Sequence, residues 1–430
     1  MIDDELQVLG KPHKMSKKTK WLISISAIAL MILCVVLGMI IHSSLSPQQT
    51  VKIKTGKKIG DPTIVPELQT TVDSILNANM TEIGNCLQGQ AIVMDVQTGE
   101  ILAMSGRERD FEGKFQSCQN FAYQQELGSL TQTASLLAVL ESGKVQLSDQ
   151  IQTGTGIWPV ENGLEMKDHN WRWGGYGSIS LDRALAVSSN IGISKVVNNV
   201  YGNNQQGFFD QLVKMSFGQP DYIEGIDGLK PVANNSPKDN NWNNYDLLWS
   251  SIGYEWKIAP IQMLTFYNAI ANDGKMVKPT LKTGVVEIIN PQIASKANID
   301  SMQVALDHVI SQGLGKKAGS PILRVAGKTG TSQVKEYDFG EENYVSEYQL
   351  AFCGYFPADK PMYSIIVSIN KLGLPASGGG MAGVVFHDIV KWMITHDMPN
   401  LAIIDEVTKD TIDITPQKIR SISDSLQKEK

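Results

Sequence analysis

The stretch QELGSLTQTASLLAVLESGKV, residues 125–145, decides the fold class and locates the candidate site. Its mostly apolar segment 130–140 is too long for an ordinary strand and lies between Gly128 and Gly143, so the pattern predicts a buried helix. Ser129 then lies at the N-terminus of this helix. A serine there is commonly a helix cap, but it is also where the helix dipole would favour a serine nucleophile.

The composition limits the classes of function. With 430 residues, of which 42% are hydrophobic, the chain is long enough for a substantial core. The net charge is -6 and no basic run is interleaved with aromatic residues, so nucleic-acid binding is not expected. The 6 histidines are scattered, and no spacing of His, Cys or Asp is typical of a metal site. Neither a metal nor another cofactor is predicted.

An uncharged apolar run near the N-terminus, WLISISAIALMILCVVLGMII at residues 21–41, is about long enough to cross a membrane as a helix. Lysines precede the run and few positive charges follow it closely, which by the positive-inside rule keeps the N-terminus in the cytoplasm. The run is too long for a cleaved signal peptide, and no clear cleavage site follows it. We expect a cytoplasmic tail at 1–20 and a single transmembrane anchor in the cell membrane at 21–42, with the rest of the chain outside the cytoplasm.

The rest of the chain divides where its composition changes. Residues 43–85 are expected to form a linker or short juxtamembrane segment, with a short amphipathic helix from Pro66 to about Met80. Residues 86–396 have the patterning of a globular domain, and residues 397–430 form a polar tail.

Two cysteines of the predicted external part could form a disulfide. Cys86 and Cys118 would lie in a compartment where disulfides persist. Sequence alone does not bring two cysteines within bonding distance, so their pairing is left open.

Segments of strand length lie at both ends of the domain, with helical segments between them. The first pair flanks the turn QTGE, a hairpin signal, and the later strands are joined partly by the tight turn PADKP, which favours antiparallel pairing. The predicted fold class is α/β, of the α+β type, with the first hairpin and the later strands in one antiparallel sheet flanked by helices. The predicted strands lie at 90–106, 324–334, 348–356 and 362–372, and the predicted helices lie at 130–140, 180–200 with a central break, 259–275 and 382–395.

Three short motifs hold the candidate site residues. GSLTQ places a serine before the buried helix and a glutamine one turn further on the same face. SSN falls in the break between two helical segments, and KTGT lies on a strand of small residues. Each motif alone is more simply explained as a cap, a break or a tight edge strand. The candidate site residues are Ser129, Gln132, Ser188, Asn190, Lys328, Thr329, Gly330 and Thr331.

Taken in this order, the motifs resemble those of the transpeptidase domain of penicillin-binding proteins, in the membrane-anchored class B form. The family motifs are S-x-x-K, S-x-N and K-T-G. The stretches VMDVQTGEILAM, GSISLDRALAVSSN, SIGYEWKIAPIQM and VAGKTGTSQV extend the resemblance over about residues 90–393. The resemblance implies the penicillin-binding and serine β-lactamase fold. The segment 43–87 is shorter than the non-catalytic module that class B proteins usually carry.

The resemblance also implies an activity, D,D-transpeptidation of peptidoglycan. Ser129 would attack the D-Ala-D-Ala end of a stem peptide to form an acyl-enzyme, and an amine of a neighbouring stem would then take the acyl group. Ser188 would pass a proton to the leaving amine, and Asn190 would hold the donor amide. The implied partners are peptidoglycan stem peptides, β-lactams that mimic the donor, and other membrane proteins of cell-wall synthesis. The residues suited to the substrate carboxylate and backbone are Lys328, Thr329, Gly330 and Thr331.

One position departs from the family motif, because Gln132 stands where the S-x-x-K lysine would be. A side-chain amide is not a useful base near neutral pH, and a positioned base contributes about 10²–10⁴-fold to a rate. Further S-x-x-K matches begin at Ser332, Ser368 and Ser425, but they lie in strand-like runs or in the polar tail. None of them follows a turn into a buried helix, so none replaces Ser129.

Two hypotheses of different class follow from Gln132. In the first, the chain is an impaired transpeptidase in which Lys328, or a route through Ser188, substitutes for the missing base. In the second, the chain is a catalytically inactive binding or scaffold protein that grips a stem peptide, a β-lactam or a cell-wall partner without turnover.

Overall fold

The computed structural model describes residues 59–243, 245–338, 344–396 and 398. The predicted membrane anchor at residues 21–42 lies outside these ranges and stays a prediction. Within the described ranges, no helix combines the length and the apolar character needed to cross a membrane.

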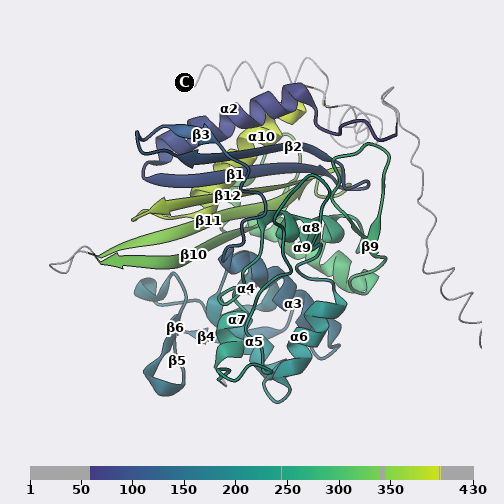
Figure 1. Ribbon diagram of the computed structural model, residues 1–430. Helices are drawn as coiled ribbons and strands as arrows, with labels where there is room; N and C mark the ends of the chain where they lie inside the picture. The colour runs from purple at the N-terminus through teal and green to yellow at the C-terminus, as the bar shows by residue number, and fades with distance from the viewer. Residues whose placement is uncertain (1–58, 244, 339–343, 397, 399–430) are drawn as a thin grey trace, which may run out of the picture. The chain divides into compact units, whose positions relative to one another are not determined.

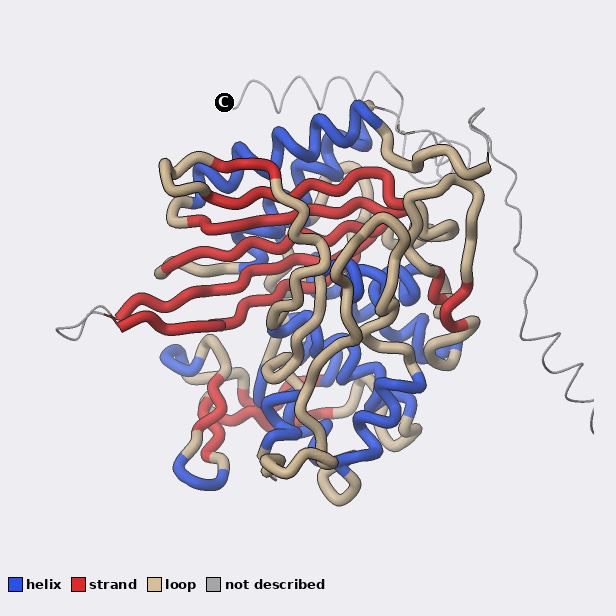
Figure 2. Tube along the Cα trace, in the orientation of Figure 1, coloured by secondary structure: helices blue, strands red, loops and turns tan. Residues whose placement is uncertain are grey.

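One six-stranded antiparallel sheet organises the described domain (Figures 1 and 2). The first hairpin lies beside the last long strand, with Val93 opposite Ile365, which confirms that the two ends of the domain share one sheet. The strand that carries the KTGT motif is at an edge, paired on one side only. In sheet order the strands are β10 (Ala326–Asp338), β11 (Tyr344–Phe356), β12 (Tyr363–Leu372), β1 (Cys86–Asp95), β2 (Ile101–Arg109) and β3 (Phe115–Ser117).

Helices α2 (Pro66–Ile83) and α10 (Gly383–Thr395) cover one face of the sheet (Figure 1). Successive residues of a strand point to opposite faces, so Ala91 of β1 joins the core beneath these helices, whereas Ile92 joins the core on the other face. Helix α2 was expected within the linker segment, yet it packs on the sheet through one buried stripe at helical spacing. The stripe consists of Leu68, Val72, Leu76 and Met80.

The other face of the sheet rests on a set of helices. Helix α8 (Pro260–Ala271) is buried along its whole length and packs on β11 and β12. The remaining helices are α3 (Thr131–Glu141), α4 (Leu181–Ala186), α5 (Asn190–Tyr201), α6 (Gln205–Lys214), α7 (Asp246–Ser250) and α9 (Lys296–Ser311). The short strands are β4 (Gln150–Gly154), β5 (Ile157–Pro159), β6 (Glu165–Lys167), β7 (Gly177–Ser180), β8 (Met276–Val277) and β9 (Ile288–Asn290).

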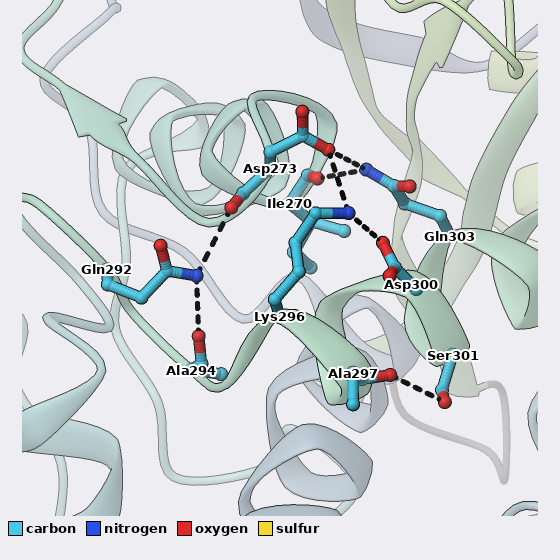
Figure 3. A network of polar contacts seen from close by, with 9 residues as sticks. All are labelled: Ile270, Asp273, Gln292, Ala294, Lys296, Ala297, Asp300, Ser301 and Gln303. Carbon is cyan, nitrogen blue, oxygen red and sulfur yellow. Dashed lines mark hydrogen bonds and ion pairs between the residues drawn. The ribbon is translucent and has the colours of Figure 1, made fainter.

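Helix α9 is absent from the predicted helices, and a polar network fixes its first turns (Figure 3). Lys296 lies 3.6 Å from Asp273, at the end of α8, and also pairs with Asp300 one turn further along α9. Gln303 donates a hydrogen bond of 2.8 Å to the carbonyl of Ile270 on α8. These contacts hold α9 against α8, and α9 in turn packs along β10.

The cysteines of the described domain are unpaired. Cys86, Cys118 and Cys353 are free thiols, so the disulfide that the sequence left open between Cys86 and Cys118 is not formed.

Candidate active site

Ser129 lies in the 3₁₀ turn Gly128–Leu130, which leads directly into α3. Gly128 has a φ of 55°, a conformation that favours glycine, and a Cβ there would lie 3.0 Å from the carbonyl oxygen of Thr331 on β10. From the other side, a Cβ on Gly253 would lie 2.0 Å from the Gly128 carbonyl oxygen. The turn that presents Ser129 is therefore held between β10 and the segment after α7, with no room for larger residues.

Helix α3, which follows Ser129, is held in place by burial and by buried hydrogen bonds. Its first ten residues are all buried, which confirms the predicted buried helix. The Tyr267 hydroxyl of α8 donates to the Leu130 carbonyl at 2.9 Å and shares a hydrogen bond of 2.7 Å with Thr133. Ser135 donates to the carbonyl of Ser251 at 2.7 Å. These buried bonds fix the rotation of the helix and thereby the direction in which Gln132 points.

Gln132 is fully buried and links the S-x-N motif to α3. Its Oε1 accepts a hydrogen bond from the Ser188 hydroxyl at 3.1 Å, and its Nε2 donates to Asn190 Oδ1 at 3.0 Å. A lysine in this position could donate to the same two residues. The amide thus keeps the hydrogen-bonded connections of the site but supplies no group that can take up a proton near neutral pH.

The SSN motif forms a tight turn between α4 and α5, with Ser188 at a φ of 54°. Hydrogen bonds to the end of the neighbouring β5–β6 segment hold this turn in place. Asp168, directly after β6, is fully buried and accepts hydrogen bonds from the Ser189 hydroxyl at 2.7 Å and from the Ile191 backbone N–H at 3.1 Å. Asn190 donates to the Lys167 carbonyl at 3.2 Å.

Asp168 is a site residue that the sequence does not reveal, because nothing distinguishes it from the other acidic residues of its polar, Trp-rich stretch, Glu161 and Glu165. Burial raises the pKa of its carboxyl group, and the hydrogen bonds that it accepts from the turn oppose that shift. Its contacts hold the turn that carries Ser188, so it acts on the site through position.

Lys328 of β10 is the fully buried cation of the site. Its Nζ donates to the Ser188 hydroxyl at 2.8 Å and to the Thr329 carbonyl at 3.0 Å. Burial lowers the pKa of Lys328 to about 7, since no charged partner offsets the loss of water. At neutral pH this amine is therefore divided between its charged and neutral forms.

A second glycine-rich turn supports β10 beside the site. Gly378–Ala382 forms a π-helical turn before α10, and its first backbone N–H donates to the exposed Thr331 side chain at 2.9 Å. A Cβ on Gly378 would lie 2.1 Å from the Gly330 carbonyl oxygen, and a Cβ on Gly330 would lie 2.4 Å from the Leu127 carbonyl oxygen. Three separate backbone segments thus meet at van der Waals distance along β10. The run of three glycines at 378–380 is the sequence signal for this contact.

A cavity of about 400 Å³ lies elsewhere, near the outer strands β2 and β3, and contains none of the predicted site residues. The residues that line this cavity are Asn77, Met80, Thr81, Gly84, Asn85, Cys86, Arg109, Gly113, Lys114 and Phe115.

The structure therefore brings the three sequence motifs together. A serine at a helix N-terminus, a buried hydroxyl and amide network and a buried amine on an edge strand adjoin one another beside a six-stranded sheet. This fold and this arrangement define a transpeptidase-type domain.

The comparison with known families names the class more closely. The family model "Penicillin binding protein transpeptidase domain" matches residues 89–391, and the chain belongs to this family.

Two curated relatives illustrate how the match is distributed. The chain is 26% identical over 327 residues to stage V sporulation protein D of Bacillus subtilis (strain 168), covering 70% of this chain and 48% of that protein. It is 24% identical over 330 residues to the peptidoglycan D,D-transpeptidase FtsI of Escherichia coli (strain K12), covering 74% of this chain and 52% of that protein. The chain spans about half the length of the curated relatives it matches.

Solved structures share the fold at low identity. The transpeptidase domain of penicillin-binding protein 3 from Burkholderia pseudomallei superposes with a TM-score of 0.65 at 23% identity, covering 79% of this chain and 97% of that domain. Penicillin-binding protein 3 from Mycobacterium tuberculosis, complexed with aztreonam, gives a TM-score of 0.63 at 23% identity, covering 80% and 81%.

Proposed function

We propose that this chain is a class B-like, membrane-anchored penicillin-binding protein whose Ser129 undergoes acyl transfer with D-Ala-D-Ala stem peptides, slowly, because Gln132 occupies the place of the lysine base. The observation that carries the proposal is the intact network around Gln132. The hydroxyl of Ser188, the amide of Asn190 and the amine of Lys328 remain assembled around it although it cannot take a proton.

The proposed chemistry follows from the positions of these groups. Ser129 would attack the carbonyl carbon of the substrate at the N-terminal end of α3, where the helix dipole favours the developing negative charge. Lys328 and Thr331 would attract the terminal carboxylate, and the edge strand β10 offers unpaired backbone groups to an extended peptide. Without a base at position 132, formation of the acyl-enzyme would be slower by about 10²–10⁴-fold.

A second candidate function is binding without turnover. The observation in its favour is that both ends of the Gln132 amide are hydrogen-bonded, so the glutamine stabilises the closed network as a structural part. A site of this kind would grip a stem peptide or a β-lactam reversibly and serve as a scaffold for other cell-wall synthesis proteins.

The location of the protein is part of the proposal. The apolar run at residues 21–41 would hold the chain in the cell membrane in a single pass, with the N-terminus in the cytoplasm and the transpeptidase-type domain outside. This is the side on which peptidoglycan, the proposed partner, is cross-linked.

Fluorescent-penicillin labelling and intact-mass spectrometry of the full-length chain test both candidates, with Ser129→Ala as the control. Slow labelling with a matching mass increase that vanishes in Ser129→Ala supports acylation. Saturable binding without any mass increase supports the second candidate. Neither binding nor labelling, in the parent or in Gln132→Lys, would contradict both.

A further inference from the structure

We propose that Lys328, acting through the hydroxyl of Ser188, takes the place of the missing base and accepts the proton of Ser129 when the acyl-enzyme forms. The inference rests on the proposed function, since it explains how Ser129 reacts at all with Gln132 beside it. The geometry points to this route because Ser188 is hydrogen-bonded on one side to Gln132, three residues after the nucleophile, and on the other side to Lys328.

Lys328 has the surroundings of a base rather than of a structural cation. It is fully buried, and no carboxylate in the described ranges lies within ion-pair distance of its amine. Its hydrogen bonds go to a hydroxyl and a carbonyl oxygen, those of Ser188 and Thr329. A buried lysine without a counter-ion readily gives up its charge, and the pKa of about 7 leaves a large neutral fraction at neutral pH.

The charged and titratable groups around Lys328 leave its amine free to act. His169 lies near enough to Lys328 for their charges to interact. Burial lowers the pKa of His169, the charge on Asp168 opposes this shift, and the charge on Lys328 adds to it. On β11 the neighbour in register is Cys353, whose thiol stays protonated because burial raises its pKa well above the ordinary value.

Helix α9 also packs along β10, and its acidic and basic groups are engaged elsewhere. Asp307 pairs with Arg324, and His308 pairs with Asp182 on α4. Neither the 3₁₀ turn Gly128–Leu130 nor the turn Gly378–Ala382 carries a titratable side chain.

The proposed step balances without any further reactant. As the Ser129 oxygen bonds to the substrate carbonyl carbon, its proton passes to Ser188, and the Ser188 proton, turned from Gln132 towards β10, passes to the neutral amine of Lys328. When the carbon–nitrogen bond of the substrate breaks, the Lys328 ammonium returns a proton through Ser188 to the leaving nitrogen. A β-lactam follows the same course with the ring nitrogen as the leaving group.

The experiment measures the rate of fluorescent-penicillin acylation of the full-length chain from pH 5.5 to 9, at saturating and at low penicillin concentration. The variants are Ser188→Ala and Lys328→Met, with Lys335→Met as the matched control, because Lys335 is an exposed lysine on the same strand. Thermal unfolding checks that each variant is folded. The saturating rate separates loss of proton transfer from loss of carboxylate binding, which lowers only the apparent affinity.

We expect the rate of the parent at low penicillin concentration, which reports the free protein, to rise with pH and to reach half its maximum near pH 7. Ser188→Ala and Lys328→Met should lower the saturating rate by about 10²-fold or more, and Lys335→Met should leave both rates unchanged. A flat pH profile, or a folded Lys328→Met that keeps the parent rate, would overturn the inference while leaving acylation by Ser129 intact. Absence of acylation in the parent at every pH, with reversible binding retained, would also overturn it and favour the scaffold function.

Discussion

Replacing Gln132 by lysine should convert a slow site into a fast one. Gln132 Oε1 and Lys328 Nζ are both hydrogen-bonded to the Ser188 hydroxyl, at 3.1 and 2.8 Å, so they lie no more than the sum of these distances, about 6 Å, apart. An amine that took the place of Oε1 would lie at this distance from Lys328. Two positive charges at that distance repel by about 3 kcal/mol at an effective dielectric constant of about 20, which is worth about two pKa units. Because Lys328 alone has a pKa of about 7, the pair holds at most one proton at neutral pH. One amine is then always available as a base.

We expect Gln132→Lys to raise the saturating rate of penicillin acylation by about 10²–10⁴-fold at pH 7. Its rate should also persist below pH 7, where that of the parent falls. Both effects are measured by quenching the labelling reaction at successive times and quantifying the product on gels and by intact-mass spectrometry. Gln132→Met is the matched control, since it fills the buried site without a base and should show no gain. A folded Gln132→Lys that reacts no faster than the parent would refute the view that this position alone limits acylation.

The remaining predictions concern the residues that support the site. The folded pKa of Lys328, about 7, lies below its ordinary value of 10.5, so the unfolded chain binds more protons between these values and the stability of the parent should rise with pH across that window. Lys328→Met removes the buried amine and should raise the free energy of unfolding by about 4 kcal/mol at pH 7. In urea titrations the stability of this variant should then stay constant from pH 7 to pH 10, whereas that of the parent rises. Asp168→Asn leaves the Ile191 N–H or the Ser189 hydroxyl without its acceptor, which should cost about 1–3 kcal/mol and slow acylation in the Gln132→Lys background; an unchanged rate would remove Asp168 from the site. Gly378→Ala places a Cβ 2.1 Å from a carbonyl oxygen of β10 and should destabilise by about 1–3 kcal/mol in thermal unfolding, whereas Gly383→Ala, whose nearest neighbour would be 3.5 Å away, should be neutral or slightly stabilising.

Local patterns in the sequence were sufficient for the elements that carry the site. The apolar run after Gly128 predicts α3, and the break at SSN predicts the turn between α4 and α5, because each depends on residues within a few positions. The later strands follow one another closely and are joined partly by the tight turn PADKP, which likewise predicts the antiparallel sheet.

The features of the site that could not be predicted from the sequence depend on contacts between residues far apart in the chain. Asp168 becomes a site residue only because the β5–β6 segment folds against the SSN turn. A glycine is needed at position 253 because a side chain there would collide with the carbonyl group of Gly128, 125 residues earlier. The residues next to Gly253 in the sequence do not indicate this contact. The lowered pKa of Lys328 follows from complete burial, which the position of its strand at the edge of the sheet does not suggest.

The order of strands in the sheet also determines when the protein can fold. Strand β1 pairs with β12, for example at Asp95 and Tyr363. The hairpin β1–β2 is synthesised early, whereas β12 is among the last elements to be synthesised. Until β12 arrives, β1 has an uncovered edge of backbone donors and acceptors, the kind of surface that pairs with other chains. A sheet closed by such distant segments folds slowly, because the loop entropy is lost before the pairing is gained. A chain that ends before β12 should therefore keep this open edge and be recognisable by it to proteases and chaperones.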